Sequence, residues 1–309
     1  MIIGLSILGA LILLFFIVEL IIYFIVFYSP DRVQNDIYNI PRNEQYDSYR
    51  EEMKKNITEI KNTPCEEIYI KSHDGLMLYG EYYHLKDGAP LEICFHGYRG
   101  TAERDMNGGF SLSRLRGRNV LLCHQRAHGK SEGHTLTFGI KERFDVVSWA
   151  NYATERFGKD VKIILIGVSM GATTVLMASG ENLPKTVKGI LADCPYSKVD
   201  EIIKKVCKDI KCPSKIFYPL IALSARIFGR FSLTEVSAEE QVKKATVPIL
   251  VLHGGDDRFV PCYMSENIEK NNPLVRRYVF ENAGHALCFY SDIERYKEIV
   301  REFEKATDC

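Results

Sequence analysis

The chain begins with its longest apolar run. Residues 2–28 contain one charged residue, Glu19. A helix over this run exceeds the roughly 20 residues that are needed to cross a bilayer. No basic segment precedes the run, it is longer than the apolar core of a secretory signal, and no small-residue cleavage site follows it. These features favour a retained transmembrane anchor over a cleaved signal peptide.

The charges beside this run indicate its orientation. Lys and Arg are absent before the run, whereas Arg32, Arg42 and Arg50 follow it. Because basic residues mark the cytoplasmic side of a span, we expect a single-pass membrane protein with its catalytic domain in the cytoplasm. Glu19 is either a tolerated protonated acid or a residue with a role in partner binding or proton relay.

After the anchor, the pattern divides the chain into a polar connector and a folded domain. Residues 1–29 form the anchor, and residues 30–63 form a connector that is either a stalk or a helix lying over the domain. Residues 64–309 alternate short apolar strands with amphipathic helices, which predicts an α/β fold with a doubly wound, mostly parallel sheet. The expected strands contain the segments EEIYIKS, LMLYGEYYH, LEICF, NVLLCHQ, VKIILIG, GILADC, VPILVLHG and VRRYVFE.

One connection in this domain is longer than a helical crossover requires. Residues 195–246 are therefore expected to form a small helical cap over the active site. Within them, the apolar stretch KIFYPLIALSARIFGRF either packs between cap and core or lines an apolar pocket. The second alternative would suit an acyl or other apolar substrate group.

Residues 161–180 predict a strand, a tight turn and a helix, with Ser169 at the apex of the turn. Gly167 and Gly171 flank the serine. Residues without side chains are needed there if strand and helix are to approach closely. A G-x-S-x-G string alone arises by chance in roughly one chain in ten of this length. A capping serine is the simpler interpretation, but the strand-to-helix setting favours a nucleophile.

A nucleophilic serine needs a base, and the base needs an acid to orient it. In a doubly wound sheet these groups come from loops at the carboxyl ends of later strands. Asp257 follows the strand that ends at residue 254, and His285 follows the strand over 275–281. The neighbouring Asp256 and the more distant Asp193 are alternatives for the acid.

Four motifs together resemble the serine-type α/β-hydrolase superfamily. They are F-H-G-Y-R-G, G-V-S-M-G, H-G-G-D-D-R-F-V-P and A-G-H, and they span about residues 65–306 in the family's order. The likeness is nearest to small membrane-anchored bacterial members that resemble serine aminopeptidases and prolyl-oligopeptidase-type hydrolases. It implies that Ser169 is the nucleophile, Asp257 the acid and His285 the base. It also implies that the Tyr98 amide helps to hold an oxyanion.

The second oxyanion donor follows from position, because the amide of Met170 immediately follows the nucleophile. A further segment, H-Q-R-A-H-G-K-S-E-G, is similar to an arginine-containing loop of the same superfamily. It departs from the family pattern at His124 and Ala127, which puts the local structure of that loop in doubt. His96, like the other histidines outside the triad, is expected to be a structural hydrogen-bonding residue.

Composition excludes several other functions. Basic and acidic residues both number 40, so the sequence does not suggest a nucleic-acid partner. The nine cysteines are scattered, with no C-x-x-C pair, so neither a zinc site nor a redox motif is indicated. An odd number of thiols favours a reducing compartment.

We therefore expect a membrane-anchored serine hydrolase that cleaves an ester or thioester through an acyl-enzyme, without metal or organic cofactor. Its partners would be a small-molecule or lipid-like acyl substrate and, through residues 2–28, the membrane. A peptidase of the same fold and a catalytically silent, membrane-tethered binding protein are the alternatives.

Overall fold

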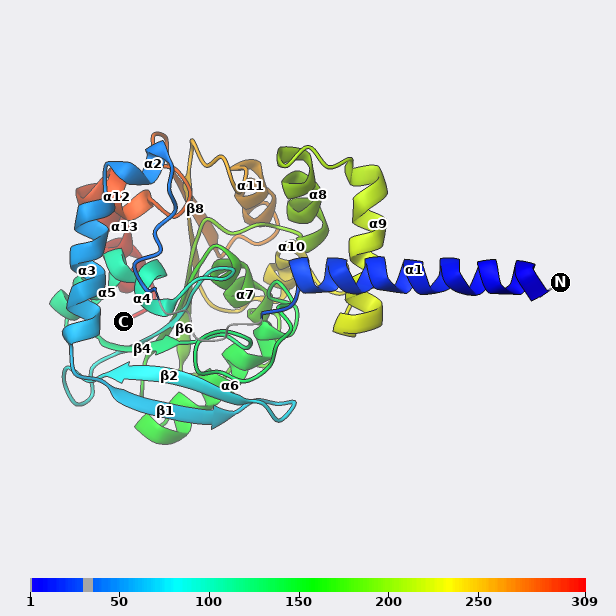
Figure 1. Cartoon of the computed structure of the whole chain (residues 1–309). Coiled ribbons are helices and arrows are strands. Elements are labelled where there is room, and N and C mark those ends of the chain that lie inside the picture. The colour runs from blue at the N-terminus through cyan, green and yellow to red at the C-terminus, as the bar shows by residue number, and fades with distance from the viewer. Residues whose placement is uncertain (1, 30–35) are drawn as a thin grey trace.

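A twisted sheet forms the centre of the computed structural model, which describes residues 2–29 and 36–309 (Figure 1). Within these residues the strand order is β1-β2-β4-β3-β5-β6-β7-β8. The pairs β1–β2 and β2–β4 are antiparallel, and every other pair is parallel. The predicted α/β fold with a mostly parallel sheet is therefore confirmed. The strands are β1 Glu66–Lys71, β2 Met77–Tyr83, β3 Leu91–Phe95, β4 Asn119–Cys123, β5 Ile163–Val168, β6 Val187–Asp193, β7 Ile249–Gly254 and β8 Val275–Phe280.

Helices cover both faces of the sheet. They are α1 Ile2–Val26, α2 Glu44–Asp47, α3 Arg50–Asn62, α4 Ala102–Asp105, α5 Asn107–Leu115, α6 Glu142–Phe157, α7 Met170–Ala178, α8 Val199–Asp209, α9 Ser214–Ser224, α10 Ala238–Gln241, α11 Tyr263–Glu269, α12 Cys288–Ser291 and α13 Ile293–Ala306. A short π-helix, η1 (Ala225–Gly229), follows α9, and a 3-10 turn, η2 (Val242–Lys244), follows α10.

The alternation of side chains along the strands divides the apolar core into two layers. On β5, Ile163 and Leu165 pack into the layer that contains α6 and α7, whereas Ile164 packs into the layer that contains α13. Helices α5 and α3 lie on the same face as α13. This burial on both faces explains why the central strands are apolar at nearly every position.

Helix α1 is, among the described residues, the one helix long and apolar enough to cross a membrane. Residues 2–18 are exposed, whereas Tyr23 and Phe27 are buried in the core of the domain. The Tyr23 hydroxyl lies 2.6 Å from the Thr135 hydroxyl, which ties the end of the helix to the domain. Arg32, one of the charges that suggest the orientation, lies outside the described residues.

The connector lies against the domain, and its helix α3 packs on α4 and α5. Met53, Ile57 and Ile60 are the buried residues of α3.

The segment 195–246 forms α8, α9 and α10, of which α9 packs against α1 and α10 packs against α7. Thus the two most apolar segments outside the core, α1 and α9, contact each other. The division at residues 29 and 63 remains a prediction.

Candidate active site

Ser169 sits in a strained turn between β5 and α7. Its φ of 56° and ψ of −115° are unfavourable for a residue with a side chain. A Cβ atom on Gly167 would lie 2.3 Å from the backbone of Gly171, and a Cβ atom on Gly171 would lie 2.0 Å from the carbonyl oxygen of Phe95. Both glycines are therefore required by close backbone approach, as the sequence predicts.

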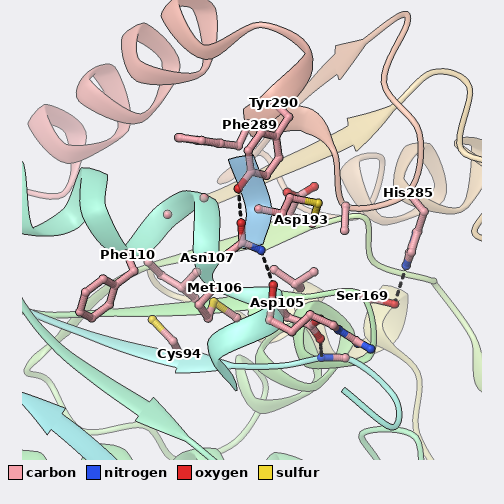
Figure 2. Close-up of a pocket in the computed structure, with 18 of the residues that line it drawn as sticks. Cys94, Asp105, Met106, Asn107, Phe110, Ser169, Asp193, His285, Phe289 and Tyr290 are labelled. Atoms are coloured by element: carbon pink, nitrogen blue, oxygen red, sulfur yellow. Dashed lines mark hydrogen bonds and ion pairs between the residues drawn. The ribbon is translucent and has the colours of Figure 1, made fainter. Parts of the chain in front are cut away.

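The structure brings the three residues of the predicted triad together. His285 Nε2 lies 2.9 Å from Ser169 Oγ (Figure 2). On the other side of the ring, His285 Nδ1 lies 2.7 Å from Asp257 Oδ2. The other carboxylate oxygen, Asp257 Oδ1, accepts hydrogen bonds from the amides of Phe259 and Val260, at 2.9 and 2.8 Å. The loop thus fixes the carboxylate, and the carboxylate fixes the imidazole.

Neither alternative acid contacts His285 in the described residues. Asp256 lies at the surface, where it pairs with Arg258 and accepts a hydrogen bond from Gln45. Asp193 is buried and accepts a hydrogen bond from the Cys194 thiol at 3.2 Å. Of the three carboxylates considered from the sequence, only Asp257 has the geometry of a triad acid.

Electrostatics couple Asp257 and His285. Burial alone lowers the pKa of His285, but the adjacent Asp257 carboxylate outweighs it and raises the pKa well above the ordinary value. Burial opposes ionisation of Asp257, yet His285 and the nearby His253 hold its pKa well below the usual range. Asp257 therefore stays ionised, and His285 titrates above the range of a free imidazole.

The amides of Tyr98 and Met170 are the predicted oxyanion donors, and the hydrogen bonds around them can be compared. Met170 is the first residue of α7. The first amide to donate a helical hydrogen bond is that of Thr173, which donates to the carbonyl of Ser169. The Met170 amide, being earlier, therefore has no partner within the helix. In the loop after β3, the Gly97 amide donates to Asp105 at 2.7 Å and the Arg99 amide donates to His128 Nε2 at 3.1 Å.

Between these two anchored amides, the Tyr98 amide has no acceptor among the described residues. Gly97 also approaches the nucleophile, since a Cβ atom placed on it would lie 3.3 Å from the Ser169 Cβ. The loop therefore presents one unpaired amide next to the serine. Tyr98 and Met170 therefore remain the predicted donors of an oxyanion hole, which requires backbone amides without other acceptors.

Comparison with known proteins places this geometry in a recognised fold. A family model for the alpha/beta hydrolase fold matches residues 93–209. The esterase Pf2001 of Pyrococcus furiosus is 24% identical, with a TM-score of 0.64 over 81% of this chain and 92% of that chain. Est1E of Butyrivibrio proteoclasticus, solved with ferulic acid, is 23% identical, with a TM-score of 0.60 over 76% of this chain and 97% of that chain. This chain has the α/β-hydrolase fold. The predicted resemblance to that superfamily is confirmed.

The chain is also similar to curated bacterial proteins. It is 29% identical over 189 residues to the uncharacterized protein YqkD of Bacillus subtilis, a match that covers 60% of this chain and 62% of that protein. The match therefore spans less than two thirds of that relative. The uncharacterized protein Rv2307c of Mycobacterium tuberculosis is 23% identical over 223 residues, covering 71% of this chain and 72% of that one.

The arginine loop, which departs from the usual sequence of this fold, keeps an ordered structure. Ala127 adopts a φ of 62°, the left-handed conformation that a glycine would favour. Arg126 forms ion pairs with Asp145 at 2.6 Å and Asp74 at 2.8 Å. The loop also carries His128, which holds the Arg99 amide. Burial lowers the pKa of His128 well below its ordinary value, so its ring stays neutral and can accept that bond.

The end of α1 is attached to the loop after β3, a contact that the sequence gives no means of predicting. The Tyr98 hydroxyl donates to the carbonyl of Val26 at 2.8 Å. The Arg99 guanidinium donates to the carbonyls of Ile25 and Tyr28, at 2.9 and 3.1 Å. Tyr98 and Arg99 thus cap the last carbonyls of α1, which lack partners within the helix.

A cavity of about 850 Å³ extends from Ser169 between the sheet and helices α5 and α13 (Figure 2). Much of its wall is apolar, although Asp105, Asn107, Arg116 and Asp193 also line it. The residues of this wall include Cys94, Met106, Phe110, Leu112, Val120, Leu122, Ile166, Val168, Leu191 and Val300. Among the described residues, none that lines the cavity comes from 195–246. Lys205 of α8 nevertheless donates a hydrogen bond to the carbonyl of Arg258 at the mouth of the cavity, while α9 packs on α1. The cap over the active site therefore remains a prediction.

The connector contributes to the mouth of the cavity. Residues 41 and 43–46 line it, together with Arg258 and Phe259. Gln45 donates to the carbonyl of Asp256 at 2.9 Å, and the Tyr46 hydroxyl donates to the carbonyl of His285 at 2.7 Å. The segment that sequence analysis treats as a connector thus holds the loops of the triad from outside.

Two groups of buried donor atoms near the site lie close enough to share a cation. They are Cys194, His253 and Asp257, and Asp193, Cys194 and Cys288. In the first group, the Asp257 oxygens already accept hydrogen bonds from His285 and two loop amides. That carboxylate is therefore committed to orienting the histidine.

The close approach at Gly171 makes a direct prediction. Gly171→Ala places a methyl group against the Phe95 carbonyl, so the free energy of unfolding should fall by about 1–3 kcal/mol, as in other overpacked sites. Gly109→Ala is the control, because its Cβ atom would meet no heavy atom within 4 Å. That change should raise stability by about 0.5–1 kcal/mol, since alanine favours a helix. Chemical denaturation of the full-length protein in detergent micelles measures both. Equal stabilities would contradict the packing argument.

Proposed function

We propose that this protein is a membrane-anchored serine hydrolase that cleaves a carboxylic ester, or a thioester, through an acyl-enzyme. The observation that carries the proposal is the hydrogen-bonded chain from Ser169 through His285 to Asp257. The unpaired Tyr98 and Met170 amides beside the serine support the same reaction. The similarity of fold to the esterases Pf2001 and Est1E adds support.

The reaction follows from the roles of these groups. His285 Nε2 removes the Ser169 proton while the serine oxygen attacks the substrate carbonyl, and the two amides stabilise the negative oxygen. His285 then gives the proton to the leaving alcohol or thiol, and the acyl group remains on the serine. A water molecule, deprotonated by His285, attacks the acyl-enzyme and releases the carboxylic acid. Asp257 keeps the required tautomer throughout.

The cavity supports an apolar acyl group as the part of the substrate that is buried. Its wall offers aliphatic, aromatic and sulfur-containing side chains, which favour a hydrocarbon chain.

Exposed apolar residues along α1 support a single membrane span. All nine cysteines are free, which supports a catalytic domain on the cytoplasmic side. We therefore propose a lipid-like acyl ester as substrate.

The first test removes the nucleophile. Ser169→Ala should lower kcat for short p-nitrophenyl esters by at least about 10³-fold, because the triad acts as a unit. It should also abolish labelling by a fluorophosphonate probe. Ser232→Ala, a change remote from the triad, should leave both unchanged. Full ester hydrolysis by Ser169→Ala would refute the assignment, and faster cleavage of aminoacyl arylamides than of aryl esters by the unmodified protein would indicate a peptidase.

The second test concerns pH. A general base works only when neutral, so activity is lost as pH falls through the pKa of His285. Because Asp257 raises that pKa, the acid limb of kcat/KM should have its midpoint above about 6.5, the ordinary value for histidine. Initial rates from pH 4 to 9 on a soluble aryl ester measure it. A midpoint below the ordinary value would contradict the coupling to Asp257.

The third test concerns the depth of the acyl site. At about 3.3 Å per residue, Ile166 lies roughly 10 Å below Ser169 along β5. Val120, which is on β4 two strands away and level with Ile164, lies roughly 16 Å below Ser169 when measured along the strand direction. With C–C bonds of about 1.5 Å in a zigzag, these depths correspond to chains of about eight and twelve carbons.

Ile166→Phe should therefore reduce hydrolysis of octanoyl and longer esters by tenfold or more. Val120→Phe should spare octanoyl esters and reduce only dodecanoyl and longer ones. Steady-state rates on p-nitrophenyl esters of graded length measure the effect, and an unchanged acetate rate in both variants serves as the control for folding. A chain-length profile that neither substitution alters would show that the acyl group lies elsewhere.

A further inference from the structure

We infer that residues 210–231, here called the arm, form an interfacial element that lies on the surface of an anionic lipid bilayer. The arm contains α9 and η1. The inference rests on the proposed role of α1 as a membrane span, and it adds a second surface by which the domain meets the lipid.

The arm lies across α1 where this helix leaves the domain (Figure 1). Ser224 Oγ donates to the carbonyl of Glu19 at 2.9 Å, and the rings of Tyr23 and Phe228 are 5.9 Å apart. The Glu19 side chain is fully buried beneath this contact. Glu19 therefore marks the level at which the arm crosses α1, and it does not face the lipid.

The length of α1 beyond this crossing matches a bilayer. Residues 2–18 are exposed and, at about 1.5 Å per residue, extend for roughly 26 Å. The hydrocarbon core of a bilayer is about 30 Å thick. If these residues span the core, the arm lies at the boundary between hydrocarbon and headgroups, across the axis of the span.

The side chains of the arm suit that boundary. Ile216, Phe217 and Ile227 are exposed, with Ile216 at 62% of its full accessible surface. The arm contains four basic residues and no acidic one. The basic residues are Lys211, Lys215, Arg226 and Arg230, all of them exposed.

Exposed apolar side chains beside Lys and Arg, with no carboxylate among them, are the composition of helices that lie in an anionic membrane interface. A soluble protein partner would match the same composition less directly, because α1 already brings the arm to the lipid. The positive charge of the arm is complementary to anionic phospholipid headgroups. With the arm on the lipid surface, the domain lies on one side of α1, and the tilt of the domain relative to the membrane is fixed.

Tryptophan quenching by brominated phospholipids tests this placement in the full-length protein. The natural tryptophan, Trp149, is 1% exposed and supplies a constant background. Phe217→Trp reports on the arm and Phe16→Trp on α1. Leu115→Trp, at a position 84% exposed on α5, is the matched control.

We expect quenching of the added tryptophan at positions 16 and 217, and none at position 115. Quenching at position 16 without quenching at position 217 would overturn the arm and leave the span intact. Absence of quenching at both positions would overturn the span and, with it, the arm.

The lipid charge is tested by comparing vesicles of phosphatidylcholine with vesicles that also contain phosphatidylglycerol. The anionic lipid should increase quenching at position 217 by roughly twofold, because basic residues are drawn to the surface. Adding Lys215→Glu and Arg226→Glu should abolish that increase. Lys55→Glu with Lys305→Glu, an equal change of charge at exposed positions away from the arm, should preserve it. Equal loss in both double variants would refute the specific role of the arm.

Discussion

The close contact between α7 and β3 is the constraint on which the rest of the site depends. Gly171 passes so near the Phe95 carbonyl that no side chain fits between them. Next to this approach, Ser169 adopts a strained conformation with a positive φ of 56°, at the end of β5. The same approach sets the first amide of α7 beside the loop that follows β3. In the proposed function, this one backbone contact positions both Ser169 and the amides of Tyr98 and Met170.

A second level of support comes from the amino-terminal part of the chain. The carbonyls at the end of α1 are held by Tyr98 and Arg99, and the triad loops are held by Gln45 and Tyr46. The candidate anchor and connector thus contact the loop after β3 and the loops that carry Asp256 and His285 directly. For the same reason, deletion of residues 1–29 would remove Phe27, which is fully buried in the core of the domain, and the hydrogen bonds to Tyr98 and Arg99. Full-length protein is therefore the appropriate material for enzymology.

The cavity and the arm lie on different parts of the molecule, and each uses apolar surface differently. The cavity lies between the sheet and helices α5 and α13, and in the proposed function it receives one acyl chain. The arm is open and carries basic residues at its edges, so it suits an extended lipid surface. A membrane-bound hydrolase with both would remain at the bilayer while it accepts an acyl chain into the interior of the domain.

The sequence by itself determined the elements whose cause is local. Strand and helix positions follow from periodicity, and the serine turn follows from its two glycines. The grouping of Ser169, Asp257 and His285 was predictable because the carboxyl ends of parallel strands meet at one edge of a sheet.

Tertiary structure decided which surfaces meet. An apolar pattern states that a segment is buried, but it does not name the partner, because the hydrophobic effect has no direction. Hence the segment 195–246 could be recognised as apolar and long, yet the packing of its helix α9 on α1 could not be foreseen. The capping of α1 by Tyr98 and Arg99 was likewise hidden, since backbone carbonyls carry no sequence signature and hydrogen bonds between distant residues arise only once the chain has folded.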